Sequence, residues 1–416
     1  MSNLTTSFAI AFDTMKKNRS RVAMTIFGVV IGIAMVIVVL SAGAGVKGLV
    51  LGEISSFGNN WIQVEIKIPD TGKQSGQNAG GQVRGVTITT LTYEDAQAIQ
   101  KIPNVSTAYA ALTGQSVISY ANETKRPTIF GVTTEYMEID TGTIGDGRFF
   151  TENEERGAAQ VIVLGSAVAE DLFGNDRAVD QTVSVNKKSY RVVGVMSERG
   201  GGGFFSFDDV VFIPLRTVQK KIMNIDHVSW ITTQVKDNNK SEATAEEIRS
   251  VLRDRHDITD PDKDDFAVTT MAESIAIVDT IFTGITWLLI ALATISLFVG
   301  GVGIMNVMYV SVVERTFEIG LRKATGATRK HILLQFLTEA VCITLIGGVI
   351  GMIIGIAVSF LISVIANALG FSWEFQISIF SIILGIGFSS GVGLLFGLYP
   401  AKKAAALDPM VAIRQE

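Results

Sequence analysis

Cysteine is almost absent from this 416-residue sequence, which has only 1. That residue, Cys342, lies within a long apolar run, so the polar middle of the chain has no disulfide of its own. A small disulfide-stapled fold is thereby excluded, and the middle part must be held by apolar burial and strand pairing. We interpret Cys342 as a small packing residue.

Motifs for catalysis and metal binding are also missing. The sequence contains no Gly-x-x-x-x-Gly-Lys-Ser/Thr phosphate loop, no nucleophile elbow and no evident pair of catalytic carboxylates. Its three histidines, His227, His256 and His331, lack metal-ligand spacing. The acidic run Asp260–Asp265 lacks the Gly and closing Glu of a calcium loop, which favours a solvated loop. We expect a non-enzymatic chain with no metal or cofactor of its own.

Charge is scarce as well, and long apolar runs take its place. Only 18% of residues are charged, 48% are hydrophobic and the mean hydropathy is +0.37, which is too apolar for an ordinary soluble protein. Four runs are long enough for a hydrocarbon core of about 30 Å: Val22–Leu40, Thr280–Val313, Ala340–Ile365 and Phe375–Leu398. The second run exceeds that length, so we expect one of its ends to project into water.

The distribution of charge orients these spans. Gly43–Ile275 carries 23 Lys+Arg and 32 Asp+Glu, a net charge of −9, and the remainder of the chain is +4. The basic residues of the remainder all fall on one side of a four-span topology: Lys16, Lys17, Arg19, Arg21, Arg315, Arg322, Lys323, Arg329, Lys330, Lys402, Lys403 and Arg414. The positive-inside rule then predicts a multi-pass cell-membrane protein with both termini cytoplasmic and the acidic block outside.

The acidic block has repeated strand and helix signals. Trp61–Ile68 alternates as a strand, LTYEDAQAIQ is typical of a helix with Thr92 as N-cap, and strand-like QSVISY follows. The same order returns in HVSWITTQV, SEATAEEIRSVLRDR and FAVTT. Between them, Asn122–Ile222 contains the strand-like segments PTIFGV, QVIVLG, SYRVVGVM and DDVVFIP. We predict a split βαβ-type domain with a strand-rich insertion.

Three further segments have a local pattern. Residues 1–21 place Leu4, Phe8, Ala11, Phe12 and Met15 on one helical face, which favours a helix along the inner leaflet over a disordered basic tail. Asp70–Gly85 is typical of a flexible loop. Gly200–Gly203, followed by two phenylalanines, is either a partner-binding tip or a plain surface turn, and the sequence leaves both open.

The chain is organised around Ser296–His331, SLFVGGVGIMNVMYVSVVERTFEIGLRKATGATRKH. After an uncharged glycine-rich half, this stretch becomes amphipathic: Val313, Phe317, Leu321 and Ala324 share one helical face, and Gly326 stands where the helix should stop. A short helix held between two spans can be pushed by a soluble partner. A solvated basic loop is the alternative interpretation.

The amino-acid sequence of this stretch favours the interpretation as a helix that a soluble partner pushes. GGVGIMNVMYVSVVERTFEIGLRKATGATRKHILLQFLTEA resembles the signature of permease subunits of MacB-type ABC exporters in the FtsX-like superfamily. NRSRVAMTIFGVVIGIAMVIVVLSAGAG resembles the family's opening helix, and GLYPAKKAAALDPMVAIRQE resembles its closing motif, with Pro400 expected to end the fourth helix. The acidic block more weakly resembles the family's porter-like lobe and second outer lobe.

The resemblance implies an α-helical membrane protein with four transmembrane helices and a large α+β extracytoplasmic domain of two lobes. We predict the following division: 1–21 cytoplasmic amphipathic helix, 22–42 first span, 43–275 extracytoplasmic domain (porter-like 43–121 and 223–275, inserted lobe 122–222), 276–313 second span with outer stalk, 314–332 coupling loop, 333–365 third span, 366–374 outer loop, 375–399 fourth span and 400–416 cytoplasmic tail.

The spans themselves offer helix contacts and no charged path. Within the four apolar runs there is no Lys or Arg, and Asn306 is the main polar exception. Small residues recur at the spacing of close helix contacts: Gly28, Gly32, Gly347, Gly351, Gly355, Gly393 and Gly397. We expect these residues and Asn306 to serve helix packing, including a homodimer, although generic tolerance of glycine in membrane helices is the alternative.

The resemblance also implies the function. The chain would be a permease that couples ATP hydrolysis by two copies of a separate ATP-binding subunit, which hold the ATP and Mg, to motion of the extracytoplasmic domain. The ATPase-coupling residues would be Glu314, Arg315, Glu318, Gly320, Arg322, Lys323 and Gly326. Such mechanotransmission would drive efflux of drugs, macrolides or antimicrobial peptides, and hence antibiotic resistance, through an outer adaptor protein. No nucleic-acid partner is expected.

Two alternatives remain open. Within the superfamily, a lipoprotein-releasing or cell-division-type permease would share the coupling loop, and its cargo would differ. From another class, a membrane sensor would bind a ligand with its extracytoplasmic domain, but it should carry an inner signalling domain.

Overall fold

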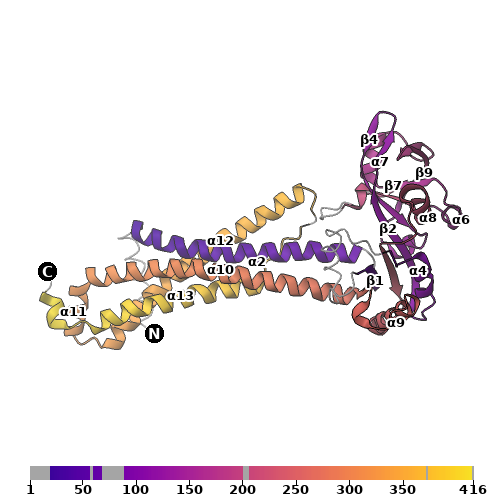
Figure 1. Ribbon diagram of the computed structural model, residues 1–416. Coiled ribbons are helices and arrows are strands. Elements are labelled where there is room, and N and C mark those ends of the chain that lie inside the picture. The colour runs from indigo at the N-terminus through magenta and orange to yellow at the C-terminus, as the bar shows by residue number, and fades with distance from the viewer. Residues whose placement is uncertain (1–18, 57–59, 68–88, 200–205, 372, 415–416) are drawn as a thin grey trace. The chain divides into compact units, whose positions relative to one another are not determined.

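The computed structural model describes residues 19–56, 60–67, 89–199, 206–371 and 373–414. The chain divides into two compact units (Figure 1). The helical unit comprises residues up to Gly48, Thr280–Ala368 and residues from Trp373 onward, and the sheet unit comprises Leu49–Asp279 and Leu369–Ser372. The segments 1–18, 68–88 and 200–205, which include most of the predicted N-terminal helix and both predicted glycine-rich loops, lie outside the described residues.

Among the described residues, four helices are long and apolar enough to cross a membrane, as the sequence predicts. They are α2 (Arg19–Ser56), α10 (Met271–Glu314), α12 (Arg329–Ala368) and α13 (Ile379–Ala406). The 44 residues of α10 make a helix about 66 Å long, about twice a bilayer's hydrocarbon thickness. All four helices extend beyond their apolar runs.

Close contacts between small residues hold the long helices together. A Cβ on Gly28 would lie 3.0 Å from the Cα of Gly300, so α2 and α10 cross with their backbones almost touching. Gly351 and Gly355 of α12 receive α2 in the same way, and Gly393 and Gly397 of α13 receive α12. These glycine faces are therefore occupied by helices of the same chain.

The fourth long helix departs from prediction at Pro400. Instead of ending the helix, Pro400 lies inside α13, which continues to Ala406. The proline leaves the carbonyl of Phe396 without its usual donor, but both flanking turns remain helical. The chain then enters a short helix, α14 (Pro409–Arg414), where Asp408 Oδ1 accepts a hydrogen bond of 2.8 Å from the Met410 amide.

One twelve-stranded mixed sheet runs through the described part of the sheet unit. Its strands are β1 (Trp61–Ile66), β2 (Val105–Gln115), β3 (Ile118–Tyr120), β4 (Glu123–Lys125), β5 (Thr128–Val132), β6 (Ile144–Gly147), β7 (Val161–Leu164), β8 (Thr182–Val185), β9 (Lys188–Met196), β10 (Val210–Pro214), β11 (Trp230–Val235) and β12 (Phe266–Thr270). Their order is β12-β1-β11-β2-β5-β10-β7-β9-β8-β3-β4, with β6 on β9.

Shorter helices cover this sheet. The α-helices are α4 (Tyr93–Ile99), α5 (Tyr136–Ile139), α6 (Glu152–Arg156), α7 (Ser166–Phe173), α8 (Leu215–Thr217) and α9 (Ser241–Arg255). Short 3₁₀ segments span Phe207–Asp209, Asn238–Lys240 and Pro261–Lys263, and Val218–Met223 forms a π-helix. One face of the sheet packs against α4, α7 and α9, and the other packs an aromatic core that includes α5 (Figure 1).

The predicted halves are visible in the strand order. The β-α-β elements before and after the insertion supply β1, β2, β11 and β12 at one end of the sheet, and the four segments predicted as strands of the insertion form β5, β7, β9 and β10. The prediction for the strand after the first helix was wrong. The segment after α4 that joins this end is Val105–Gln115, whereas QSVISY contributes β3 at the opposite end. Both sets of strands share one continuous ladder through the β2–β5 pair.

Candidate functional site

The predicted coupling segment folds as a separate short helix, α11 (Thr316–Ala324). Helix α10 ends at Glu314, and Arg315 leaves helical geometry with φ −106° and ψ 17°. The hydroxyl of Thr316 donates to the carbonyl of Val313 at 2.8 Å, which satisfies an acceptor freed at the break. At the other end Gly326 adopts φ +103°, a conformation that favours glycine, and α12 then begins at Arg329.

The apolar face of α11 points away from its own chain. Thr316, Ile319 and Gly320 are buried, whereas Phe317 and Leu321 are each 50% exposed. Ala324 of the same helix and Val313 near the end of α10 are exposed as well. We call Val313, Phe317, Leu321 and Ala324 the exposed α11 stripe. The sequence predicted one helix through all four residues, but the break at Arg315 separates Val313 from the other three.

The charged residues of the segment bind mainly within the chain. Arg315 Nη1 lies 3.3 Å from the carboxylate of Glu339, which is 2% exposed in α12. The same arginine approaches Glu318 at 3.8 Å. Burial makes the carboxylate of Glu339 depend on its partner, because an uncompensated buried charge is costly. Glu339 was missed as a site residue because it stands next to the first residue of the third apolar run, Ala340, where a charged side chain was not expected to be buried.

A second ion pair stiffens α11 itself. Arg322 donates to Glu318 at 2.6 Å, one turn away, and to the amide oxygen of Gln335 in α12 at 2.6 Å. The arginine is thereby held between the two helices. Arg315, Glu318 and Arg322 thus join α11 to α12, and Glu314 remains exposed at the end of α10.

The opposite side of α11 is fixed to the C-terminal segment. The amine of Lys323 donates to the carbonyls of Ala405 and Leu407, at 2.7 and 2.5 Å, and so caps the end of α13. A Cβ on Gly320 would lie 2.7 Å from the Cβ of Ala412, so only glycine lets α14 approach this closely. These contacts clamp α11 between α12 on one side and the α13–α14 turn on the other.

The other predicted residues are not part of this site. Asn306 is exposed on α10, and the glycines predicted for helix packing touch helices elsewhere in the unit. No cluster of three or more metal-ligating side chains occurs within the described ranges. The arrangement at α11 therefore has the features of a mechanical contact: an exposed apolar surface on a helix anchored by ion pairs.

Two family models match long parts of the chain. Residues 22–251 match the family model of the MacB-like periplasmic core domain, and residues 290–409 match that of the FtsX-like permease C-terminal region. The second match contains all of α11, α12 and α13.

Curated relatives align with nearly the whole chain. The macrolide export ATP-binding/permease protein MacB of Wolinella succinogenes is 37% identical over 409 residues, which is 98% of this chain and 60% of that protein. The protein of the same name from Chlorobaculum tepidum is 36% identical over 408 residues, 98% of this chain and 61% of that protein. The chain thus spans about 60% of the length of these relatives.

Among solved structures, the periplasmic region of MacB from Actinobacillus actinomycetemcomitans aligns with a TM-score of 0.45 and 22% identity, over 55% of this chain and 95% of that one. The MacB-like family model alone covers more than half of the sequence. The chain therefore belongs to the MacB-like family of ABC transporter permeases, with an FtsX-like C-terminal region.

Proposed function

We propose that this chain couples ATP hydrolysis by a separate ATP-binding subunit to movement of its sheet unit, and that the exposed α11 stripe is the contact with that subunit. The observation that carries the proposal is the half-exposure of Phe317 and Leu321 on a helix whose other sides are fixed. Apolar side chains of this size are the usual anchors of a protein interface.

The contacts around α11 suit the transmission of force. A push on the stripe reaches α12 through Arg315 and Glu339, and it reaches the end of α13 through Lys323. Because both links are polar contacts with defined partners, α11 cannot shift without moving those helices or breaking the contacts. This supports a role in coupling over that of a solvated loop.

Helix α10 offers the longer path. It is one uninterrupted helix from Met271, directly after β12, to Glu314, directly before α11. In the proposed cycle, two ATP-binding subunits close under a homodimer of this chain, and α10 carries the motion to the sheet unit outside the membrane. The cytoplasmic orientation of both termini is part of this proposal and follows from the charge distribution.

Cargo is proposed by analogy with the relatives, whose names state macrolide export. Macrolides, other amphipathic drugs or peptides would be displaced on the outer side, toward an adaptor protein, without passing between the four helices. The lack of Lys or Arg within the predicted spans supports this path. Disulfides engineered between the sheet units of two copies, in a Cys342→Ser background, should stop export until they are reduced. Undiminished export by the locked dimer would contradict this mechanism.

The stripe itself is tested by Phe317→Ser combined with Leu321→Ser. The variant should insert in the membrane but lose co-purification of the ATP-binding subunit and cargo-stimulated ATP hydrolysis in nanodiscs. The matched control is Leu395→Ser, which changes a 74% exposed leucine on α13. If the double variant keeps both activities, the stripe is a lipid-facing surface and the assignment fails.

A further inference from the structure

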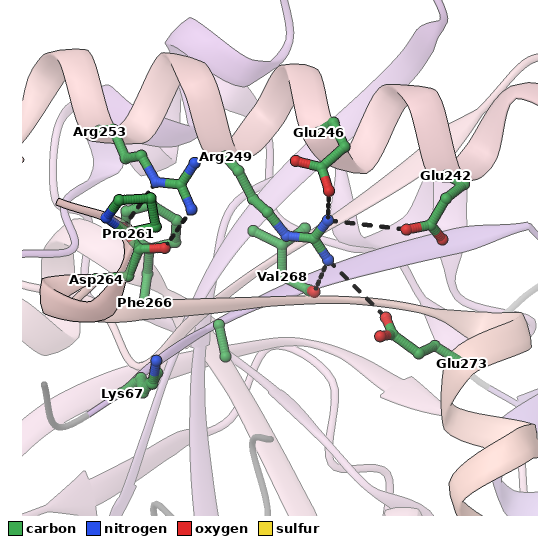
Figure 2. A pocket seen from close by; sticks show the side chains of 11 residues that line it. Lys67, Glu242, Glu246, Arg249, Arg253, Pro261, Asp264, Phe266, Val268 and Glu273 are labelled. Atoms are coloured by element: carbon green, nitrogen blue, oxygen red, sulfur yellow. Dashed lines mark hydrogen bonds and ion pairs between the residues drawn. The ribbon is translucent and has the colours of Figure 1, made fainter. Parts of the chain in front are cut away.

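A groove of about 440 Å³ lies in the sheet unit along β12, the last strand of the sheet (Figure 2). Among the described strands, β12 pairs with β1 alone, on one side. The amide of Lys67 donates to the carbonyl of Asp265 at 2.7 Å, so the alternating backbone groups of Phe266 and Val268 point to the free edge. The side chains of Phe266 and Val268 are buried, which leaves the main chain as the recognisable feature of this edge.

Part of the edge is already occupied by Arg249 of α9. Its guanidinium donates to the carbonyl of Val268 at 2.8 Å and is surrounded by Glu246 at 2.7 Å, Glu242 at 3.8 Å and Glu273 at 4.0 Å. Figure 2 shows these groups at one end of the groove. A charged side chain on an edge strand commonly guards it against pairing. Arg249 therefore protects the carbonyl of Val268. It does not contact the backbone amide and carbonyl of Phe266 or the amide of Val268.

At the other end of the groove lies Lys67, and protection of the strand edge does not explain its position. The residue is only 5% exposed, and no described residue forms a hydrogen bond or an ion pair with its amine. Arg253, which lies nearby, is paired with Asp264 at 2.7 Å, so that carboxylate is already neutralised. Figure 2 shows the amine of Lys67 pointing toward the strand. Because Lys67 lines the groove and its amine makes no hydrogen bond or ion pair with a described residue, the amine can pair with an anionic ligand there.

The two ends of the groove differ in charge along the strand. The backbone of Lys67 is hydrogen-bonded to that of Asp265, the residue just before β12. Glu273 lies three residues after the end of β12. Three glutamates face a single arginine at the second end, which gives a surplus of negative charge there. A ligand with a cationic group and a carboxylate about five residues apart would match both ends.

We propose that this groove binds an extended peptide with a free C-terminal carboxylate, added antiparallel to β12. In that direction the peptide's N-terminal side meets the glutamates and its carboxylate meets Lys67. The peptide exchanges two hydrogen bonds with Phe266 and accepts one from the Val268 amide. The Val268 carbonyl has a second lone pair, so Arg249 need not leave. Neighbouring strands are about 4.8 Å apart, so an added strand lies about 9.6 Å from the β1 backbone, which an extended lysine side chain together with its hydrogen bond can span. This inference does not depend on the proposed coupling at α11.

The test uses the full chain in nanodiscs and calorimetric titration with the pentapeptide Lys-Thr-Val-Thr-Val. The free acid should bind at least about tenfold more tightly than its C-terminal amide, since only the acid pairs with Lys67. In Lys67→Met the two peptides should bind equally, and Lys67→Arg should restore the difference. Lys101→Met, which removes an exposed lysine of the same unit, should behave like the unchanged chain.

Stability separates this role from a structural one. Because the amine of Lys67 makes no hydrogen bond or ion pair with a described residue, Lys67→Met should keep the thermal midpoint of the sheet unit while it abolishes the preference for the free acid. Equal binding of acid and amide by the unchanged chain, or no saturable binding of either, overturns the proposal. It is also overturned if the peptide binds only by dissociating an oligomer, because the groove would then belong to a second copy of the chain.

Discussion

The guanidinium of Arg315 lies 3.3 Å from the buried carboxylate of Glu339 and so joins the end of α10 to the interior of α12. Arg315→Met should remove one charged partner of that buried carboxylate and cost about 3 kcal/mol of unfolding free energy. The double variant with Glu339→Gln should recover most of the loss, because no charge is then buried. Thermal unfolding of the purified chain in one detergent measures both variants. Additive losses in the double variant would show that the two side chains do not act as a pair.

The ion pair within α11 allows a test of charge at the proposed ATPase contact. Exchanging Glu318→Arg with Arg322→Glu keeps one acid and one base a turn apart but loses the contact between Glu318 and Arg315, so we expect the unfolding free energy to fall by about 1 kcal/mol. Stimulation of ATP hydrolysis by cargo should fall severalfold if the partner subunit senses these charges. The measurement is the ratio of stimulated to basal hydrolysis, and an unchanged ratio would show that the partner does not sense them.

The sheet unit should respond to pH through a cluster between α4 and α9. His256 Nδ1 lies 2.8 Å from Asp265 and its Nε2 lies 3.4 Å from Asp95. Hydrogen bonds that the imidazole donates to these two carboxylates raise the pKa of His256 to about 9. Burial raises the pKa of Asp95, but hydrogen bonds from His256, Arg255 and Thr92 outweigh it and hold that pKa below its usual value.

The sign of each effect follows from which state holds the proton. Below a pH of about 6.5 His256 is charged in both states and its pairing stabilises the fold fully, whereas between about 6.5 and 9 the unfolded state loses the proton first. Stability should therefore fall by at most about 3 kcal/mol over that range. Acidification below about pH 4 should also destabilise, because Asp95 then takes up a proton on unfolding.

The measurement is the urea midpoint of the sheet unit, followed by tryptophan fluorescence after Trp287 and Trp373 are replaced by Phe. His256→Gln should flatten the midpoint between pH 6.5 and 9. His227→Gln is the control and should keep the slope. A slope that survives in His256→Gln would assign the pH dependence to other groups.

Helix packing can be tested with two glycines of the helical unit. A Cβ on Gly351 would lie 2.7 Å from the carbonyl oxygen of Val30, whereas Gly387 has no atom within 4 Å of that position. Gly351→Leu should therefore destabilise the bundle by roughly 1–3 kcal/mol, and Gly387→Leu should be close to neutral. Because Gly351 touches its own chain, the oligomeric state in detergent should not change. Loss of an oligomer in Gly351→Leu alone would instead place this glycine between two copies.

Periodicity indicated which residues share a face but not what that face contacts. The spacing of Phe317 and Leu321 predicted that they lie on one side of a helix. Their exposure depends on the contacts of Lys323 and Gly320 with the C-terminal segment, which hold the opposite side of α11 against the chain. The four spans were predictable because a helix that crosses the bilayer needs an apolar run as long as the hydrocarbon core is thick. Hydropathy does not show how far a helix continues into water. The third apolar run begins at Ala340, next to Glu339, whereas α12 begins ten residues before Glu339, at Arg329.

The missed strand has a different cause. β2 is buried along most of its length on both faces, and its sequence VSTAYAALTGQ is rich in small residues. A strand between two neighbours lacks the alternation of apolar and polar residues that marks a half-buried strand, so its pattern is ambiguous. The pairing of β2 with β11 joins segments more than a hundred residues apart, which no local pattern contains.

That pairing also constrains how this architecture could have been assembled or can be trimmed. The inserted segment continues its host's sheet, with β5 completing the ladder on Ala111–Gln115 of β2. An engineer who excised residues 122–222 would turn an interior strand into a bare edge, open to pairing with other chains. A shortened chain would need another segment to cover the edge of β2 that β5 now occupies. The inserted segment is therefore part of the sheet and cannot be removed without exposing that edge.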